Sequence, residues 1–193
     1  GVDKAAHIKA GQKVKQAGIE LSEYFMPGLG GAAYSKENAL ETADALNQIN
    51  PDFIRMRALA LPVAAPLTTQ FEAGEFGKMG EVATARELLL FLESLQGITS
   101  KVRSDHVLNL FSEVNGTLPA DQQKMIDPLR RFLALDAREQ MIFCIGRRTH
   151  RLSRLADLNK PELRDPVAQM CDEHGATEDN MDQIIQAIMQ RFI

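Results

Sequence analysis

Cysteine is scarce in this chain, with only two residues, Cys144 and Cys171, among 193. Neither belongs to a CxxC pair, and neither has a histidine at the spacing of a zinc site. This excludes the common zinc motifs. We expect both thiols to be buried as small hydrophobic side chains, rather than to form a disulfide or to bind a metal.

Long hydrophobic runs are also missing. No stretch reaches the roughly 18 consecutive apolar residues of a membrane span, and the N-terminus lacks the basic and then apolar pattern of a signal peptide. The formal net charge is −4, so the chain has no general attraction for nucleic acid or anionic membranes. We expect a soluble, cytoplasmic protein that does not bind membranes. Small-molecule or protein partners are favoured over nucleic acid, for which any basic surface would have to be local.

The usual phosphate-binding motifs are absent, although the chain has a glycine-rich segment. Residues 18–31 read as a strand that enters a loop with three glycines (Gly28, Gly30, Gly31), followed by a helix. Glycines let the backbone adopt positive φ and approach a bound group, and Pro27 ends the strand ladder. The segment matches neither the phosphate loop nor the Gly-x-Gly-x-x-Gly fingerprint. It is either a ligand-binding loop with exposed amides or a tight connection between strand and helix.

Apolar periodicity predicts alternating helices and strands over the first 60 residues. Asp3 can cap a helix whose small apolar face is Ala6, Ala10, Val14 and Ala17. The next elements are a strand at 19–26, a helix at 36–47 capped by Ser35, and a strand at 52–59. Short connections between such elements are typical of a parallel sheet built from βαβ units.

Polar and apolar residues alternate in both predicted strands. In the second strand, Arg55 and Arg57 share one face, while Ile54 and Met56 share the other. Parallel strands covered on both sides are almost continuously apolar, so this alternation favours a barrel lumen that holds a ligand. The alternative is an edge strand with one solvated face, in which Glu20 could pair with Arg55 across the sheet.

After residue 60 the pattern becomes mainly helical. Residues 61–67 read as a rigid connector, so we divide the chain into regions 1–67 and 68–193. Three strong apolar stripes predict amphipathic helices that bury one face in a core. These stripes lie at 82–95, 119–135 and 181–192.

Two polar clusters lie in the helical region. Ser104-Asp105-His106 follows a weaker strand pattern at 98–103, where it could serve acid–base chemistry or consist of capping residues beside a surface histidine. The segment from Arg147 to Arg154 holds four arginines and no acidic residue. It could bind phosphate or an acidic partner, or it could be a solvated helix face or a clamp onto the acidic stretch at 172–179. The sequence leaves the roles of both clusters open.

Several motifs in the first 67 residues resemble the later half of a radical S-adenosylmethionine (radical SAM) barrel. They are Lys13-Val14-Lys15-Gln16-Ala17-Gly18-Ile19-Glu20-Leu21-Ser22, Met26-Pro27-Gly28-Leu29-Gly30-Gly31, Ala39-Leu40-Glu41-Thr42-Ala43 and Ile49-Asn50-Pro51-Asp52-Phe53-Ile54-Arg55. The chain is most similar to bacterial iron–sulfur oxidoreductases of that superfamily, and the resemblance extends more weakly into the helical tail.

The resemblance implies an α/β fold, namely the C-terminal part of a partial (β/α)6 TIM-type barrel followed by a mainly helical region. Residues 19–26 would be its fifth strand and residues 53–59 its sixth. Enzymes of this superfamily hold a 4Fe-4S cluster on a CxxxCxxC loop and use it to cleave S-adenosyl-L-methionine to a radical. This chain lacks that loop, and without its thiolates the cluster is not held. We therefore expect a fragment that is inactive alone and binds no cofactor by itself.

By the same resemblance, the chain would supply the adenosyl side of the cofactor site and part of the substrate cavity. Tyr24 and Arg55 would orient the substrate. The residues expected to contact the adenosyl group are Met26, Pro27, Gly28, Leu29, Gly30, Arg57 and Leu59. No catalytic or metal-binding residue is expected in this chain.

A rival interpretation is a complete, non-enzymatic α/β or helical interaction module. In that case the apolar stripes at 82–95 and 181–192 would serve self-association. A half barrel instead needs the missing N-terminal half as its partner, and it would expose an unpaired edge beside 19–26 through which copies could associate.

Overall fold

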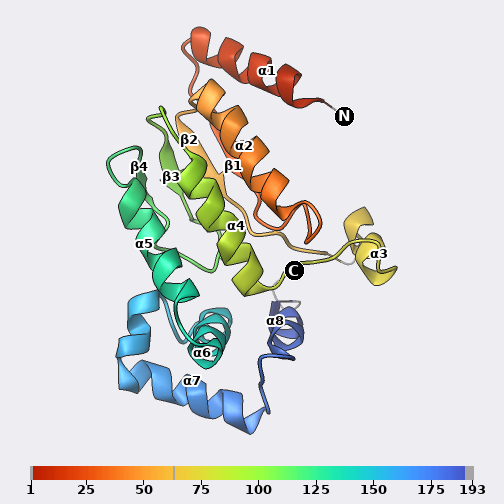
Figure 1. Ribbon diagram of the computed structural model, residues 1–193, viewed down its shortest axis with the longest axis vertical. Helices are drawn as coiled ribbons and strands as arrows, with labels where there is room; N and C mark the ends of the chain where they lie inside the picture. Colours follow the sequence, from red (N-terminus) through yellow and green to blue (C-terminus); the bar gives the residue numbers. More distant parts are fainter. Residues whose placement is uncertain (1, 63, 190–193) are drawn as a thin grey trace.

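The computed structural model describes residues 2–62 and 64–189 and has a mixed α/β fold (Figure 1). Val63 in the predicted connector and the last residues of the 181–192 stripe lie outside the described residues. The strands are β1 (Ser22–Phe25), β2 (Phe53–Met56), β3 (Lys101–Arg103) and β4 (Gly116–Thr117). The helices are α1 (Lys4–Gln16), α2 (Ser35–Ile49), α3 (Pro66–Glu72), α4 (Glu81–Ser94), α5 (Gln122–Leu133), α6 (Ala137–Arg148), the 3₁₀ helix η1 (Leu155–Asn159), α7 (Pro161–Glu173) and α8 (Met181–Met189).

The four strands form one small sheet in the order β1-β2-β3-β4. β1, β2 and β3 are parallel and are linked through α2 and α4, which confirms the predicted βαβ pattern, while β4 pairs antiparallel with β3. The sheet and its helical layer therefore continue past residue 67, through α4 and β3.

The first strand is shorter than predicted. β1 begins at Ser22 rather than at residue 19, because Gly18 turns the chain at φ 71° and Ile19 stays 59% exposed. The amide of Leu21 donates a hydrogen bond to the Asp52 carboxylate at 2.8 Å and so takes no part in the backbone pairing between β1 and β2. β2 likewise covers only Phe53–Met56 of the predicted 52–59.

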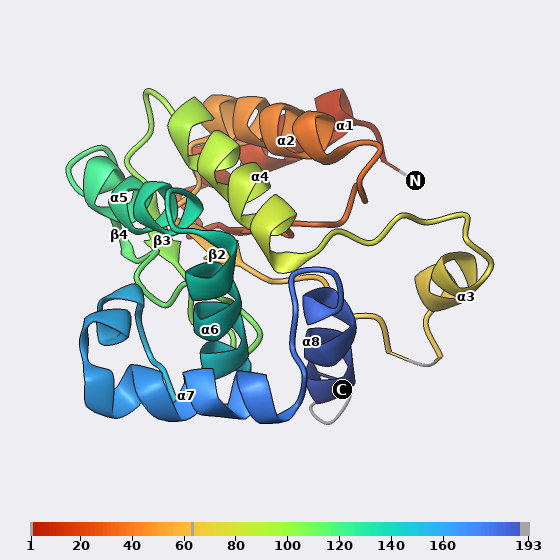
Figure 2. The ribbon, with the colours of Figure 1, turned by 60° about the horizontal axis from the view of Figure 1, so that its bottom comes forward.

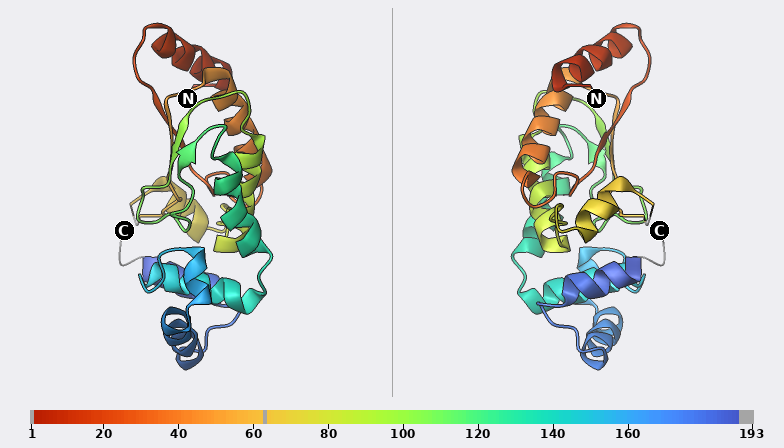
Figure 3. Two further views of the ribbon diagram at one scale, coloured as in Figure 1. Left: turned by 90° about the vertical axis from the view of Figure 1, so that its left-hand side faces the viewer. Right: turned by 90° about the vertical axis from the view of Figure 1, so that its right-hand side faces the viewer.

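The helices α2, α4 and α5 gather on one side of the strands (Figure 3). Ile54 and Met56 point toward this layer and are fully buried, and Phe25 stacks on Phe91 of α4 with ring centroids 3.8 Å apart. The opposite face carries Ser22 and Tyr24 of β1 and Arg55 of β2, which agrees with the predicted alternation in β2.

The first helix begins as predicted but packs through a different face. Asp3 caps α1 by accepting the amide of Ala6 at 2.8 Å. The predicted apolar face is wrong, because Ala6, Ala10 and Ala17 are exposed. Gly11 allows α1 to pack closely on α2, where an added Cβ would meet Ile49 at 2.8 Å, and Lys4 adds ion pairs to Glu41 and Asp44 of α2.

The helical tail packs at the C-terminal end of the parallel strands, with α6, α7 and α8 grouped together (Figures 1 and 2). The predicted stripes are largely confirmed here, since Met125, Leu129 and Phe132 of α5 are fully buried. Cys144 and Cys171 are free and buried, as expected. In the described part of the chain, no helix is both long enough and apolar enough to cross a membrane.

Candidate functional site: the open face of the sheet

One face of the sheet is not covered by the helical layer, and its side chains form a regular array that we call the open face. It consists of Ser22, Tyr24, Phe53, Arg55, Arg57, Lys101, Arg103 and Asp105. The strand register places Tyr24, Arg55 and Arg103 side by side in one row. Ser22, Phe53 and Lys101 form the neighbouring row. The predicted substrate residues Tyr24 and Arg55 therefore lie together.

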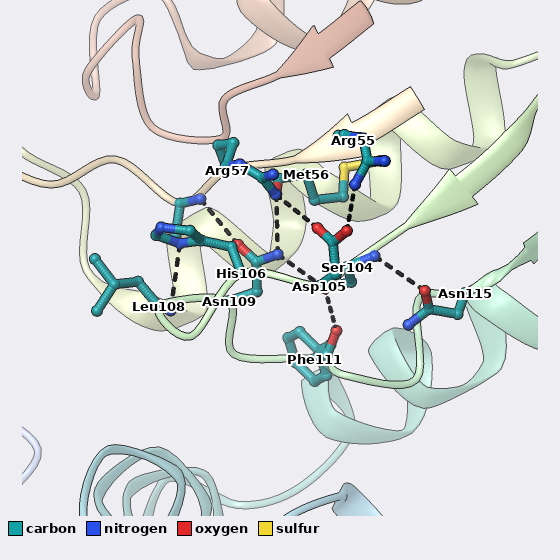
Figure 4. Close-up of polar contacts among 11 residues, drawn as sticks. Arg55, Met56, Arg57, Ser104, Asp105, His106, Leu108, Asn109, Phe111 and Asn115 are labelled. Atoms are coloured by element: carbon teal, nitrogen blue, oxygen red, sulfur yellow. Dashed lines mark hydrogen bonds and ion pairs between the residues drawn. The ribbon is translucent and has the colours of Figure 1, made fainter. Parts of the chain in front are cut away.

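Asp105, which follows β3, binds both Arg55 of β2 and Arg57, which directly follows β2 (Figure 4). Its carboxylate accepts a hydrogen bond from Nη1 of Arg57 at 2.7 Å and another from Nη1 of Arg55. The hydrogen bond from Arg57 is the main reason that the pKa of Asp105 is lowered, with the charge of Arg55 adding to it. Arg55 thus pairs with Asp105 and not with Glu20, which lies before β1 and is exposed.

Aromatic rings contact three of the cations on this face. The guanidinium of Arg57 lies 5.2 Å from the ring centre of Tyr24. Arg55 and Lys101 both approach the ring of Phe53, at 5.8 and 5.5 Å. Such contacts hold the cations near the ring faces while leaving their outer sides in solvent.

The backbone beneath the two arginines is fixed by Asn109, which the sequence analysis did not single out. Its side-chain oxygen accepts a hydrogen bond from the amide of Ala58 at 2.9 Å, and its side-chain nitrogen donates one to the carbonyl of Met56 at 3.1 Å (Figure 4). It also donates to the hydroxyl of Ser104 at 3.1 Å. These bonds tie the end of β2 to the loop after β3.

Ser104-Asp105-His106 is therefore not a catalytic relay. The Ser104 hydroxyl is buried and donates to the carbonyl of Phe111 at 2.7 Å, while Asp105 binds the arginines. His106 accepts the amide of Leu108 through Nδ1 at 3.3 Å. The three side chains have different partners: Asp105 ties the loop to β2, whereas Ser104 and His106 bond within the loop itself.

The glycine-rich loop uses most of its own amides. Gly31 donates to the carbonyl of Gly28, and Tyr34 donates to that of Gly30. The amide of Gly28 donates at 3.1 Å to Glu87, a carboxylate of α4 that is 2% exposed. The prediction of exposed amides is therefore wrong for Gly28, and the interpretation as a tight connection is favoured.

Glu87 also accepts two side chains at the start of α2. The Ser35 hydroxyl and the Asn38 amide each donate to it at 2.6 Å. Ser35 is consequently not a helix cap, because its hydroxyl is used by Glu87 and the N-cap position is Tyr34. The buried carboxylate fixes both the loop and the helix that follows it.

The predicted adenosyl contacts are divided between two places. Pro27, Gly28 and Leu59 line a cavity of about 210 Å³ between the ends of β1 and β2, α4 and α8. Arg57 lies instead on the open face. Met26, Leu29 and Gly30 do not line the cavity, and Leu29 is 49% exposed. The cavity is smaller than the roughly 300 Å³ of the smallest typical cofactor pockets.

The cavity wall is charged but internally balanced. Arg148 of α6 donates through Nε to the Glu81 carboxylate at 2.8 Å, and both side chains are nearly buried. Lys78 also lines the cavity, and burial lowers its pKa. Arg147 donates to the carbonyls of Leu110 and Asn109. The two arginines that begin the basic run therefore stabilise the fold rather than clamp onto the acidic stretch at 172–179.

The donor set of this chain does not fit an iron–sulfur cluster. Burial strongly raises the pKa of the Cys144 thiol, which disfavours the thiolate that a cluster needs, and Cys171 is also buried. Among the described residues, no group of His, Cys, Asp and Glu side chains could hold a metal ion. Comparisons of the chain with protein-family models, with curated proteins and with solved structures gave no match.

Proposed function

We propose that this chain forms the last arc of a partial (β/α)6 barrel of the radical SAM type. In such a barrel the helices lie outside and one face of the sheet forms the inner wall. The observation that carries the proposal is that helices cover only one face of the three parallel strands. The other face holds hydrogen-bonded polar side chains near the C-terminal ends of these strands. Active sites of barrels of this kind lie at that end.

In the proposed barrel, Tyr24, Arg55 and Arg57 bind and orient the substrate. Pro27, Gly28 and Leu59 line the wall beside it, where the adenosyl group of S-adenosyl-L-methionine would lie. The cluster and the cofactor would be held by strands upstream of this chain and would supply the radical. The chain alone is expected to be inactive, because its two cysteines are buried and unsuited as ligands.

The experiment that tests the proposal uses the reading frame that surrounds the coding sequence of Gly1. If the proposal holds, codons upstream of Gly1 encode a CxxxCxxC loop. The extended protein, prepared without oxygen, then contains one four-iron cluster and releases 5′-deoxyadenosine on reduction. An upstream sequence without this loop, or an extended protein that releases none, contradicts the proposal.

Arg57→Ala in the extended protein tests the assignment on the open face. We expect substrate turnover to fall by at least about tenfold because the substrate is no longer positioned, while the iron content stays unchanged. Arg131→Ala is the matched control, since Arg131 is exposed on α5 and makes no ion pair within the described residues. Unchanged turnover in Arg57→Ala would remove Arg57 from the site.

A further inference from the structure

We infer that the open face binds a small, planar anion that carries two or more carboxylate or phosphate groups on an aromatic ring. This inference names the substrate class of the proposed barrel and so rests on the proposed function. The face itself, however, lies within this chain and is accessible to a direct binding measurement. Three features of the open face support the inference, namely its charge, its unused hydrogen-bond donors and its rings.

The charge of the open face is unbalanced. It holds four cationic side chains, Arg55, Arg57, Lys101 and Arg103, and one carboxylate, Asp105. Arg55 lies directly beside Arg103 in the register of β2 and β3. Like charges in such a pair destabilise a sheet, and within the described residues neither Lys101 nor Arg103 has an acidic partner. A bound anion would relieve this repulsion.

The guanidinium groups keep most of their donors free for a ligand. Arg55 uses only Nη1, toward Asp105, and Arg57 uses only Nη1, toward Asp105 and the Met56 carbonyl. Arg103 makes a single 3.5 Å contact to its neighbouring carbonyl. A guanidinium presents five N–H donors in a planar fork that matches carboxylate and phosphate oxygens. Because Asp105 already orients the guanidinium groups of Arg55 and Arg57, these side chains lose little rotamer freedom when a ligand binds.

Exposed aromatic rings lie beside these guanidinium groups. Tyr24 is 55% exposed and lies in register beside Arg55, with the Arg57 guanidinium over its ring. Phe53 lies one row away and is partly exposed. A planar ligand ring can stack on Tyr24 while its anionic groups reach Arg55 and Arg103, which favours an aromatic over an aliphatic anion. A cationic ligand would be repelled by the same array.

A set of matched probes separates charge from ring stacking, using the chain as it is. The probes are benzene-1,3,5-tricarboxylate, the aliphatic propane-1,2,3-tricarboxylate and the neutral benzene-1,3,5-tricarboxamide. Titration calorimetry at low ionic strength should show the strongest binding for the aromatic tricarboxylate. We expect binding roughly fivefold weaker for the aliphatic probe and none for the amide. Benzyl phosphate and phthalate, compared at equal charge, then distinguish a phosphate from a carboxylate ligand.

Arg103→Gln is the main variant, because Arg103 has no structural ion pair to lose. It should weaken binding of the aromatic tricarboxylate by about tenfold. Arg131→Gln, at an exposed position of α5 that is not part of the open face, should leave the affinity unchanged. Thermal unfolding of both variants checks that the fold is retained, and chemical-shift changes confined to the open face locate the bound probe.

Three results would overturn the inference: no binding of either tricarboxylate, equal binding of the neutral amide, or unchanged affinity in Arg103→Gln. The same inference fails if a single-stranded oligonucleotide binds this face far more tightly than every small probe. These outcomes do not depend on an iron–sulfur cluster. An extended protein that cleaves S-adenosyl-L-methionine while this face binds no anion would retain the proposed function and reject only the substrate class.

Discussion

Glu87 has the largest structural role of any single side chain near the glycine-rich loop. We predict that Glu87→Ala lowers the free energy of unfolding by about 2–4 kcal/mol, because the amide of Gly28 and the side chains of Ser35 and Asn38 lose their buried acceptor. Glu87→Gln is the matched control and should cost about 1 kcal/mol, since its amide can keep all three contacts. Urea unfolding measures both, and equal losses would contradict this role.

Asp105 should make stability depend on pH in the acid range. Its pKa is lowered in the folded protein, so its contribution is complete above its unfolded value of about 3.9 and is lost as the pH falls through the folded value. Because the carboxylate is 42% exposed, we expect a contribution of at most about 1 kcal/mol.

Urea unfolding of the wild type and Asp105→Asn between pH 2 and 7 tests this expectation. The difference in unfolding free energy should be constant above about pH 5 and should shrink below about pH 4. A difference that is independent of pH would show that Asp105 does not act through its charge.

For a single side chain, the sequence predicts which face of a strand it takes but not its partner. The alternation in β2 correctly placed Arg55 and Arg57 opposite Ile54 and Met56. The acceptor for both arginines, Asp105, lies about 50 residues away in the chain, and only the parallel pairing of β2 with β3 brings it near. Glu87, in the apolar stripe at 82–95, and Asn109, in the loop after β3, were missed for the same reason, because neither position carries any sign of its distant partners.

Among the elements, the glycine-rich loop gives the clearest test of a structural role. An added Cβ at Gly30 would lie 2.6 Å from the carbonyl oxygen of Tyr34, which is backbone and cannot turn aside. We predict that Gly30→Ala lowers the unfolding free energy by about 1–3 kcal/mol. Gly77→Ala is the control, since its nearest atom is 3.6 Å away, and it should change stability by less than about 0.5 kcal/mol. Thermal or urea unfolding distinguishes the two, and an unaffected Gly30→Ala would contradict the packing argument.

Element types were more predictable than element bounds. The Asp3 cap placed the start of α1, and apolar stripes placed α2, α4 and α5 because periodicity reports burial directly. The packing face of α1 was wrong because a close helix contact favours glycine, and Gly11 adds nothing to an apolar stripe. β4, with two residues, is too short to leave any periodic signal.

At the scale of the whole molecule, the outer edge of β1 is the main candidate for self-association. In the described part of the chain, β1 pairs with β2 alone. The carbonyl of Leu21 accepts hydrogen bonds from the amides of Asp52 and Phe53 and therefore points toward β2. In a trans peptide the C=O and the following N–H point in opposite directions, so the amide of Ser22 points toward the unpaired edge of β1. Unpaired edges of this kind are templates for pairing with another chain.

We predict that sedimentation equilibrium shows association that increases with concentration. Ser22→Pro should weaken this association by about tenfold, because proline removes the outward amide and is tolerated at the first residue of a strand. Ser22→Ala keeps the amide and should behave like the wild type. A chain that is monomeric at all concentrations, or equal association in both variants, would exclude this edge as the interface.

The whole-molecule prediction from sequence was correct only at its coarser level. Short connections and βαβ order predicted a parallel sheet, and the structure has one. Closure of a barrel depends on strands that pair across long sequence separations, which local patterns do not encode. The barrel, the radical SAM family and the division at residue 67 therefore stay predictions.

The buried ion pair between Glu81 and Arg148 has a consequence for how the molecule opens. It joins α4, which covers the sheet, to α6 of the tail, and separating the two would leave a charge without its partner in an apolar environment. Sheet layer and tail should therefore behave as one cooperative unit, with amide protons of α4 and α6 exchanging at similar rates. By contrast α1 packs mainly on α2, and its other links are partly exposed side-chain contacts, His7 with Glu23 of β1 and Lys15 with Asp52. We expect α1 to unfold before the rest and to release β1 from this contact.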